Sequence, residues 1–492
     1  MSKKRKKPSP AAAPAASAPA AAPVPPDPTP PAKPRPETAE PPAPRGSWGN
    51  FELRLACGLG AAALAAAAYV LQGTIPVKVQ AVCGIACFLL VICTCSSNLR
   101  RVSWKTVFWG MVIQIGLAAL ILKLDLPKYP FTVNGQERYI GGPVVYDFFR
   151  IIAEAITTLL GFTAAGSGLV FGDLSKGVFA FTVLPAIVFI SSLSTVLYYF
   201  GVLQAVVKVM AKGMMALMGT SGAETLSASA NVFMGQTEAP LVVKPYVPTM
   251  TRSELLTIMT GGMATISGSL MAVYITFGAD PVAILTTSVM AAPCGLYLSK
   301  ILIPETESPV TAGNASLKSE TPFANAVDAA SAGASDGMSL AINVAAMLIA
   351  FLAIIALINA VLGWVHPALS LDAIFSRLFA PIAVLMGVTG PDVPKVAELL
   401  GTKLVVNEFI AFQKLTKDFG PASAAAMSPA AFKLSTYALT GFANLGSIGI
   451  QIGGIGGMAP TRRAEIARLG GKCLLAGFVA TLINSCVASI LM

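Results

Sequence analysis

The sequence has little charge and almost no histidine, and both shortages exclude classes of protein. Charged residues make up 12% of the 492-residue chain, against roughly 25% in soluble domains, which excludes a soluble globular protein. A single histidine, His366, leaves no basis for a multi-histidine metal centre or a histidine proton relay. The eight cysteines lie in or beside apolar runs, and their spacing suits neither a zinc site nor a disulfide framework. We interpret them as buried thiols.

Long apolar runs are what the chain has in abundance. It is 55% hydrophobic, with a mean hydropathy of +0.71. Runs of about 20 apolar residues are long enough to cross a hydrocarbon core of roughly 30 Å. Aromatic residues reach only 8% and there are no long alternating strands, so we predict an all-α polytopic membrane protein rather than an outer-membrane barrel. Nine spans are expected, at about residues 52–72, 76–96, 105–123, 178–200, 256–277, 282–303, 338–362, 432–455 and 470–491.

The first 46 residues form a basic tail rich in alanine and proline, which predicts an extended, disordered segment. Short basic runs before membrane spans set orientation or contact anionic lipid more often than they bind nucleic acid, so we expect no nucleic-acid partner. Positive residues in the tail and in the loop at 97–105 predict that both are cytoplasmic. Nine spans then leave the C-terminus external, in a plasma membrane (the inner membrane of a bacterium).

Three regions lack the pattern of a simple span. Residues 146–165 place charged side chains among apolar ones, which predicts a helix at the membrane interface. Residues 203–250 and 371–418 are too long for one crossing and are interrupted by glycine, proline and charge. We interpret each as a re-entrant helical hairpin, because non-helical backbone survives at membrane depth only inside protein or beside water. Paired interrupted segments of this kind indicate a transporter's binding site near the midplane.

Polar side chains gather in both predicted hairpins. A carboxylate at the bilayer centre costs on the order of 2.5–3.5 kcal/mol, so such residues are expected to be functional. In the first hairpin Gln236, Thr237 and Glu238 lie between a glycine and a proline, which suits a hairpin tip; a solvated turn is the alternative. In the second hairpin Glu408 lies beside an amide in an apolar flank, although Lys403 could neutralise it in a structural ion pair.

Two further polar clusters lie inside predicted spans. Asn444 and Ser447 are three residues apart and share one face if helical, with packing of small residues against another helix as the alternative. Residues 260–270 combine glycines with hydroxyl residues such as Thr265. This composition predicts local unwinding that frees carbonyls for a monovalent cation, and a tight helix-packing face is the alternative.

The four clusters together indicate a class of solute. Carboxylates accept hydrogen bonds from sugar hydroxyls, and amides pair with the edge of a base, so the clusters suit a polar, uncharged, polyhydroxylated solute. Phe442 could stack on a ring. An anionic substrate would call for arginine near the site, and no arginine occurs in these clusters.

These motifs resemble the concentrative nucleoside transporter family. The matching stretches are Gly235-Gln-Thr-Glu-Ala-Pro240, Lys244-Pro-Tyr, Met250-Thr-Arg-Ser-Glu254, Gly401-x-Lys-x-x-x-Asn407-Glu-Phe409 and Gly441-Phe-Ala-Asn444. They occur in the right order, and the similarity runs from about Ser97 to the C-terminus. The resemblance implies a nucleoside symporter driven by co-transported sodium or by protons, without an organic cofactor. It also implies a homotrimer in which each protomer has a scaffold subdomain and a transport subdomain that moves in an elevator-like way.

The resemblance further implies roles for individual residues. The base, in a nucleoside of the uridine or adenosine class, would meet Gln236, Thr237 and Glu238, with Leu270 packing nearby. The ribose would meet Glu408, Asn444 and Ser447, with Phe442 in the same pocket. The sodium ion would be bound by Asn231, the carbonyl of Met234, the hydroxyl of Thr265 and the carbonyl of Ile266.

The chain departs from bacterial members of the family in two ways. The bacterial core has eight spans, so the span at 52–72 and the tail are additional. Leu270 stands where valine is commoner, which bears on base preference. The expected domains are the tail (1–46), the N-terminal spans including the additional one (47–104) and the transporter core (105–492).

Three alternatives stay open. Protons could replace sodium, with Glu238 or Glu408 titrating. A passive channel would need no coupling ion. A membrane-embedded enzyme would need a nucleophile with a base, or metal ligands, and the sequence offers no apparent set.

Overall fold

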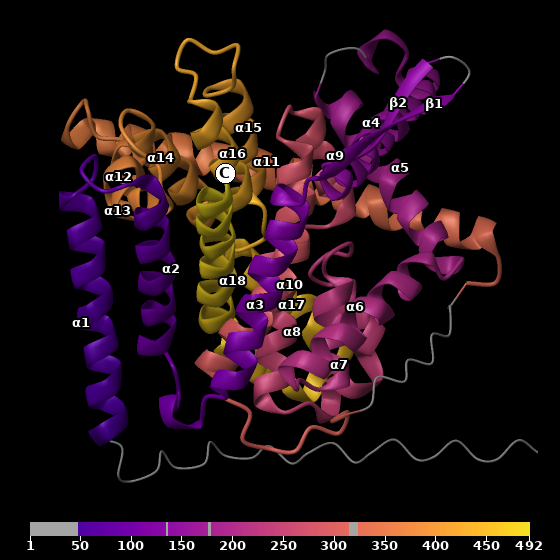
Figure 1. The fold of residues 1–492 in the computed structure, drawn as a ribbon. Coiled ribbons are helices and arrows are strands. Elements are labelled where there is room, and N and C mark those ends of the chain that lie inside the picture. The colour runs from indigo at the N-terminus through magenta and orange to yellow at the C-terminus, as the bar shows by residue number, and fades with distance from the viewer. Residues whose placement is uncertain (1–47, 134–135, 176–178, 314–322) are drawn as a thin grey trace, which may run out of the picture. The chain divides into compact units, whose positions relative to one another are not determined.

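The computed structural model describes residues 48–133, 136–175, 179–313 and 323–492, which belong to one compact unit, Arg35–Met492 (Figure 1). The predicted tail lies outside the described residues. Helices dominate, which confirms the predicted all-α class. The α-helices are α1 (Trp48–Val70), α2 (Val77–Thr94), α3 (Trp104–Lys123), α4 (Val144–Phe171), α5 (Phe179–Tyr199), α6 (Val202–Met218), α7 (Gly222–Ala230), α8 (Arg252–Ala264), α9 (Gly268–Thr276), α10 (Pro281–Leu302), α11 (Ala326–Val365), α12 (Leu371–Leu378), α13 (Ala380–Leu385), α14 (Asp392–Val405), α15 (Glu408–Lys417), α16 (Pro429–Leu439), α17 (Leu445–Met458) and α18 (Arg463–Leu491). The 3₁₀ segments are η1 (Leu99–Arg101), η2 (Gly172–Ser175), η3 (Ala239–Thr249) and η4 (Pro460–Arg462).

A short antiparallel sheet lies between α3 and α4. β1 (Leu126–Val133) pairs with β2 (Gln136–Gly142), with Tyr129 opposite Ile140. No strand was predicted for these residues. The segment is nevertheless rich in aromatic and β-branched residues, the types that favour strands.

Nine helices in the described part of the chain are long and apolar enough to cross a membrane, which matches the predicted number but not every predicted span. The predicted span at 432–455 is not one continuous helix and is not among the nine, because α16 and α17 are two short helices separated by residues 440–444. The predicted interfacial helix at 146–165 is the longer α4, which is one of the nine by length and composition. Its place at the interface stays a prediction.

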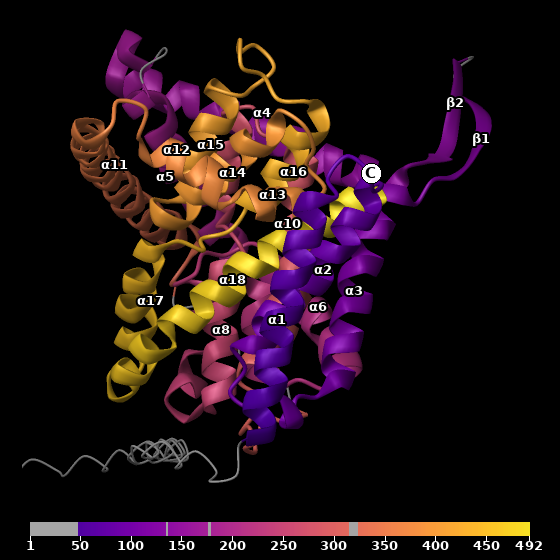
Figure 2. The same ribbon diagram turned by 90° about the vertical axis from the view of Figure 1, so that its left-hand side faces the viewer.

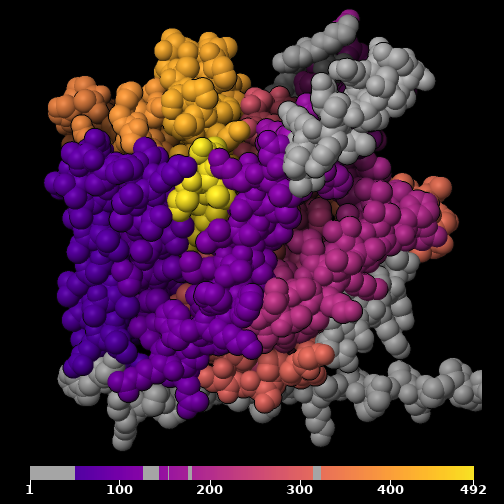
Figure 3. All heavy atoms as spheres, in the orientation of Figure 1, coloured from indigo at the N-terminus to yellow at the C-terminus, as the bar shows by residue number. Residues whose placement is uncertain are grey.

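The long apolar segments differ greatly in burial, and α8, α9 and α10 are the most buried. In the most apolar stretches of Arg252–Thr276 and Pro281–Leu302, 94% of the residues are buried, against 11% in α1 and α11. α18 packs against α8, α10 and α2, and it crosses obliquely between them in Figure 2. In Figure 3 the indigo and purple segments of α1–α3 cover the left and centre of the face, beside magenta segments on the right. Part of α18 (yellow) is visible between α1–α3 and the orange segments above. The buried core therefore centres on α8, α9, α10 and α18.

α11 extends well beyond the predicted span at 338–362. Its 40 residues reach about 60 Å at 1.5 Å per residue, roughly twice a hydrocarbon core. It packs along α5 and lies at a steep angle to α1 in Figure 1. Glycines allow the close approach, since a Cβ on Gly337 would lie 2.8 Å from the Cβ of Ser191.

Two of the buried elements are interrupted, and polar side chains cap the helices that restart. α9 begins after Ser267, whose Oγ accepts a hydrogen bond from the Leu270 N–H at 3.4 Å. α17 begins after Asn444, whose Oδ1 accepts from the Ser447 N–H at 2.9 Å. These caps satisfy backbone donors that a break leaves without helical partners. The unwinding predicted within 260–270 is confirmed.

Each predicted hairpin region contains two short helical segments that pack against each other. α7 packs against η3, and α14 packs against α15. The first region begins with the separate helix α6 and the second with α12 and α13, so the paired segments occupy only 222–249 and 392–417. These pairs are called the first and the second hairpin below. Whether they enter the membrane from one side stays a prediction.

Candidate functional site

The predicted polar clusters meet where interrupted helices restart. Three helices, α9, α15 and α17, begin after a capping side chain: Ser267, Asn407 and Asn444 respectively. The two interrupted segments are also joined through backbone, since the Phe442 N–H donates to the Thr265 carbonyl at 3.1 Å. Helix N-termini carry partial positive charge. Their convergence favours carboxylates and other oxygen groups at this place.

Glu408 is the buried acid of the site. It begins α15 and is 4% exposed. The Asn444 Nδ2 donates to its Oε2 at 2.8 Å, and the Tyr274 hydroxyl donates to its Oε1 at 3.3 Å. An ionised carboxylate offers about four acceptor positions, so these two donors leave capacity for hydroxyl groups of a ligand.

The first hairpin reaches the same acid through Gln236. The Gln236 Nε2 donates to the Ser447 Oγ at 3.2 Å, and the Ser447 N–H donates to the Asn444 Oδ1. Asn444 in turn binds Glu408. These four residues form a continuous polar series, Gln236–Ser447–Asn444–Glu408, in which the link from Ser447 to Asn444 runs through the Ser447 backbone N–H. The series joins the two hairpins through the start of α17. The structure thus brings four predicted site residues together.

A glycine in α8 makes room for this contact. A Cβ on Gly262 would lie 2.8 Å from the Gln236 Cβ and 2.9 Å from the Gln451 Nε2. Gln451 is itself held in place, because its Nε2 donates to the Met259 carbonyl at 2.8 Å. Gly262 therefore allows the tip of the first hairpin to lie directly on α8.

The other predicted binding residues surround the polar series. Leu270 and Phe442 are buried. Thr237 packs against α17, where Gly454 leaves space for its methyl group. Glu238 is exposed, and its Oε2 accepts from the Gly235 N–H at 3.0 Å. The structure therefore buries the Glu408 carboxylate and leaves the Glu238 side chain accessible to solvent.

The residues predicted to bind sodium lie where α7 and α8 end. Asn231 is fully buried, and its Nδ2 donates to the Ser227 carbonyl at 3.0 Å. Its Oδ1 is buried without a hydrogen-bond partner among the described residues. Thr265 donates its hydroxyl proton to a backbone carbonyl one turn earlier, so its oxygen keeps acceptor capacity. Met234 and Ile266 lie in the two turns beside them. A buried oxygen without a partner is costly, so this oxygen-rich set fits a monovalent cation.

Lys403 does not pair with Glu408, which corrects the ion-pair alternative. Its fully buried ammonium donates to the Ala438 carbonyl at 2.7 Å and to the Thr481 Oγ1 at 2.9 Å. The ring centre of Phe478 lies 5.6 Å away. Lys403 and Glu408 are only five positions apart in the sequence, which suggested an ion pair. They nevertheless belong to different helices, because α14 ends at residue 405 and α15 begins at Glu408.

Tyr274 also belongs to the site, although it was not among the predicted residues. Its ring stacks on Phe412 with centroids 4.2 Å apart, and its hydroxyl binds Glu408. A tyrosine inside an apolar span is the available signal, because a buried phenol usually finds a hydrogen-bond partner.

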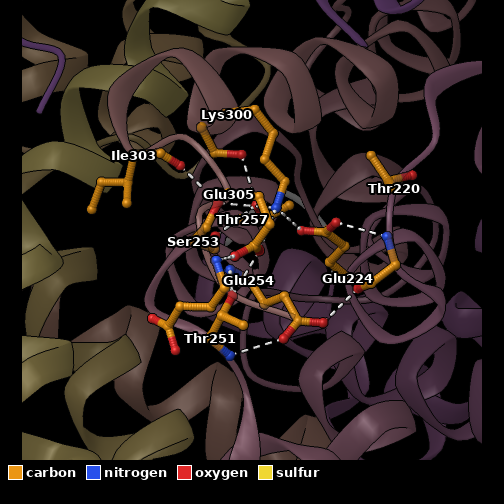
Figure 4. Close-up of polar contacts among 12 residues, drawn as sticks. Thr220, Glu224, Thr251, Ser253, Glu254, Thr257, Lys300, Ile303 and Glu305 are labelled. Atoms are coloured by element: carbon orange, nitrogen blue, oxygen red, sulfur yellow. Dashed lines mark hydrogen bonds and ion pairs between the residues drawn. The ribbon is translucent and has the colours of Figure 1, made fainter. Parts of the chain in front are cut away.

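A buried charged cluster at the start of the first hairpin was also missed (Figure 4). The Lys300 Nζ, near the end of α10, lies 2.7 Å from the Glu224 Oε2 and 3.3 Å from the Glu305 Oε2. Glu224 and Glu254 are each 1% exposed, and each accepts from the backbone N–H of the residue that caps its helix. The Ser221 Oγ donates to the Glu254 Oε1 at 2.5 Å and so links the starts of α7 and α8. We call this group the base cluster. Two Ser/Thr-x-x-Glu capping motifs were its signal in the sequence.

The far end of the first hairpin is fixed as well. The Arg462 Nη1 donates to the carbonyls of Pro248 and Met250, at 3.2 Å and 2.9 Å. Its Nη2 lies 2.6 Å from the Glu465 Oε2, which holds the guanidinium in place. Both ends of the first hairpin are therefore attached to neighbouring helices.

A cavity of about 740 Å³ lies between α4 and the starts of α10 and α16. Tyr146, Asp280 and Lys433 are among its lining residues, and none of the predicted site residues lines it. Asp280 and Lys433 form an ion pair at 3.2 Å. The cavity is therefore separate from the polar series.

Comparison with known proteins gives a consistent result along most of the chain. Residues 83–136 match the family described as Na+ dependent nucleoside transporter N-terminus, and residues 283–489 match the corresponding C-terminus. Residues 180–281 match a family described as Nucleoside recognition. An uncharacterized transporter of Haemophilus influenzae is 41% identical over 423 residues, covering 84% of this chain and 97% of the relative.

Mammalian relatives and solved structures agree with these matches. Sodium/nucleoside cotransporter 1 of Mus musculus is 42% identical over 433 residues, which cover 85% of this chain but only 64% of the cotransporter. The chain thus spans less than two thirds of that relative. CNTnw in an inward-facing substrate-bound state superposes with a TM-score of 0.77 at 37% identity, covering 84% of this chain and 98% of CNTnw. A substituted CNTnw in an outward-facing state also gives 0.77.

The fold and the polar series define a helical membrane protein of the transporter class. This chain belongs to the family of Na+-dependent, or concentrative, nucleoside transporters. It is a family of transporters rather than enzymes.

Proposed function

We propose that the chain is a symporter that imports nucleosides together with sodium. The observation that carries this proposal is the polar series Gln236–Ser447–Asn444–Glu408, which joins both hairpins in one buried site. The relatives named above as sodium/nucleoside cotransporters support the same solute and the same ion.

The chemistry of the series suits a nucleoside. Ribose hydroxyls donate to the free acceptor positions of Glu408, while the Asn444 amide holds that carboxylate in place. Gln236 presents an amide to the edge of the base, with Thr237 and Glu238 beside it. Leu270 and Phe442 supply apolar surface against the base and the sugar. The absence of arginine from these positions matches a neutral solute.

Sodium couples to nucleoside through the first hairpin. The ion binds the Asn231 Oδ1, the Thr265 hydroxyl and the carbonyls of Met234 and Ile266, beside the turn that leads to Gln236. It satisfies a buried oxygen and fixes the turn, so the base-binding side chains are in place when nucleoside arrives. Such coupling is reciprocal, so nucleoside tightens sodium binding by the same factor.

The remaining parts of the proposal concern assembly and movement. Each protomer of a homotrimer carries the hairpins and interrupted helices in a transport subdomain that moves against a scaffold, in an elevator-like way. The N-terminus is cytoplasmic and the C-terminus external. In support, the start of α1 and the C-terminus lie at opposite ends of the helices in both Figure 1 and Figure 2.

Uptake of labelled uridine into proteoliposomes tests the proposal. An inward sodium gradient should drive concentrative, saturable uptake, and nucleosides should compete according to their affinity. Accumulation driven only by a proton gradient would show that protons, and not sodium, are the coupling ion. Flux that neither saturates nor shows counterflow would indicate a channel and would overturn the symporter.

A further inference from the structure

We propose that Lys403 is a positioning residue for the sugar end of the site. It fastens the end of α14 to the end of α16, so that the helices that follow, α15 and α17, present Glu408 and Asn444 to each other. The inference rests on the proposed function and assigns to Lys403 a part in sugar selectivity.

The contacts on either side of the two breaks are paired. Before the breaks, the Lys403 ammonium near the end of α14 donates to the Ala438 carbonyl near the end of α16, at 2.7 Å. After the breaks, the Asn444 amide at the start of α17 donates to Glu408 at the start of α15, at 2.8 Å. The pair α14 and α15 is thus joined to the pair α16 and α17 by one hydrogen bond before the breaks and by another after them. A shift of α16 relative to α14 would move Asn444 away from Glu408.

Lys403 is attached firmly enough to define this geometry. It is fully buried, and the Thr481 hydroxyl of α18 is its second acceptor, at 2.9 Å. Gly441 allows α18 and α8 to close around the break, since a Cβ there would lie 2.7 Å from the Thr481 Cγ2. The ammonium therefore ties the second hairpin to both α16 and α18.

The placement of the charge also fits this function. The last carbonyls of a helix carry partial negative charge, so the end of α16 stabilises an ammonium without a carboxylate partner. A lysine that does not bind Glu408 leaves the acceptor positions of that carboxylate to the ligand. Lys403 acts on the sugar through Glu408 and Asn444 and is not itself a contact for it.

The test compares uridine with 2′,3′-dideoxyuridine, which lacks the sugar hydroxyls. Lys403→Met removes the charge and both hydrogen bonds while keeping a long apolar side chain. The KM for uridine should rise about tenfold, the equivalent of a lost hydrogen-bonded contact. The KM for the dideoxy analogue should change little, because it never used that contact. The ratio of the KM for the dideoxy analogue to the KM for uridine therefore falls about tenfold. A general loss of folded transporter lowers Vmax and leaves this ratio unchanged.

Two further variants make the result decisive. Lys417→Met, at the exposed end of α15, is the matched control and should keep the wild-type ratio. Thr481→Val removes only one acceptor and should lower the ratio about threefold. A wild-type ratio in Lys403→Met overturns the inference, and if that variant does not assemble, a wild-type ratio in Thr481→Val overturns it. Failure of the proposed function is distinguishable, since the unmodified protein would then show no saturable uridine uptake.

Discussion

The two hairpins are each fastened by a buried lysine, but the lysines have different partners. Lys300 holds the start of the first hairpin through Glu224, and it also forms an ion pair with Glu305 in the segment after α10. Lys403 holds the second hairpin through a backbone carbonyl and a hydroxyl. The first lysine meets Glu224 at the start of α7, where a carboxylate is favoured. The second meets the end of α16, where the backbone itself supplies negative charge. Whether a buried ammonium faces the start or the end of a neighbouring helix therefore decides whether it is stabilised by a carboxylate or by backbone carbonyls.

The largest effect is expected from removing the lysine that depends on ion pairs. Lys300→Met leaves Glu224 buried without its positive partner, which should destabilise the protein by about 3–5 kcal/mol. The change is measured as the Tm in detergent, which is determined from the loss of folded protein on heating. Adding Glu224→Gln should recover part of the loss, and Lys208→Met on the exposed side of α6 should have no effect. A wild-type Tm in Lys300→Met would show that the base cluster is not a stabilising contact.

The next effect concerns the buried acid of the second hairpin. Glu408→Gln keeps the size of the side chain but replaces a charged acceptor, so uptake of uridine should fall at least about 100-fold. The Tm should not fall, because the amide oxygen can still accept from the Asn444 Nδ2 while the amide nitrogen donates to the Tyr274 hydroxyl oxygen. Asp418→Asn, exposed at the other end of α15, is the matched control. Near-normal uptake by Glu408→Gln would contradict the assignment of this acid to the sugar.

A smaller effect is expected where the tip of the first hairpin lies on α8. Gly262→Ala puts a methyl group against Gln236 and Gln451, and overpacking of this kind costs about 1–3 kcal/mol. The displaced Gln236 should raise the KM for uridine, measured at saturating sodium. Gly295→Ala, whose added Cβ would meet its nearest atom at 3.6 Å, should change neither KM nor Tm. If both alanine variants kept the wild-type KM for uridine, the close approach at Gly262 would not contribute to nucleoside binding.

The smallest effect is expected from a substitution that weakens sodium binding without changing nucleoside binding. Asn231→Ala removes one cation ligand and should raise the sodium concentration for half-maximal uptake about tenfold, the equivalent of one lost contact. The KM for uridine at saturating sodium should stay the same. Sodium should also raise the Tm of the unmodified protein by mass action and do so less for the variant. An unchanged sodium dependence would remove Asn231 from the proposed ion site.

Hydropathy predicted most of the membrane-spanning helices. Local composition predicted the break between α8 and α9 but not the break between α16 and α17. The interruption after α8 was visible because glycine and hydroxyl residues crowd together around Thr265. The interruption before α17 was not, because apolar residues continue on both sides of Asn444 and hide a cap within a hydrophobic run. A cap is recognised by where the backbone donors point, which a hydropathy pattern does not contain.

The site was predicted where its residues are close in sequence and missed where they are not. Gln236 and Glu408 were found because each lies in a dense polar motif. The base cluster was missed because Glu224, Glu254 and Lys300 come from three helices, and each looks like an ordinary residue at a helix end. The partner of Lys403 was misjudged for the same reason, since its true acceptors lie 35 and 78 positions away.

The double attachment of the first hairpin has a thermodynamic consequence. The base cluster fixes its start and Arg462 fixes its end, which leaves the tip around Gly235 as the part able to rearrange. Ordering a residue costs about 1–2 kcal/mol of conformational entropy. Because most of the hairpin is ordered before any ligand arrives, that entropic penalty falls on a few residues, and weak contacts to a small neutral molecule can suffice for tight binding.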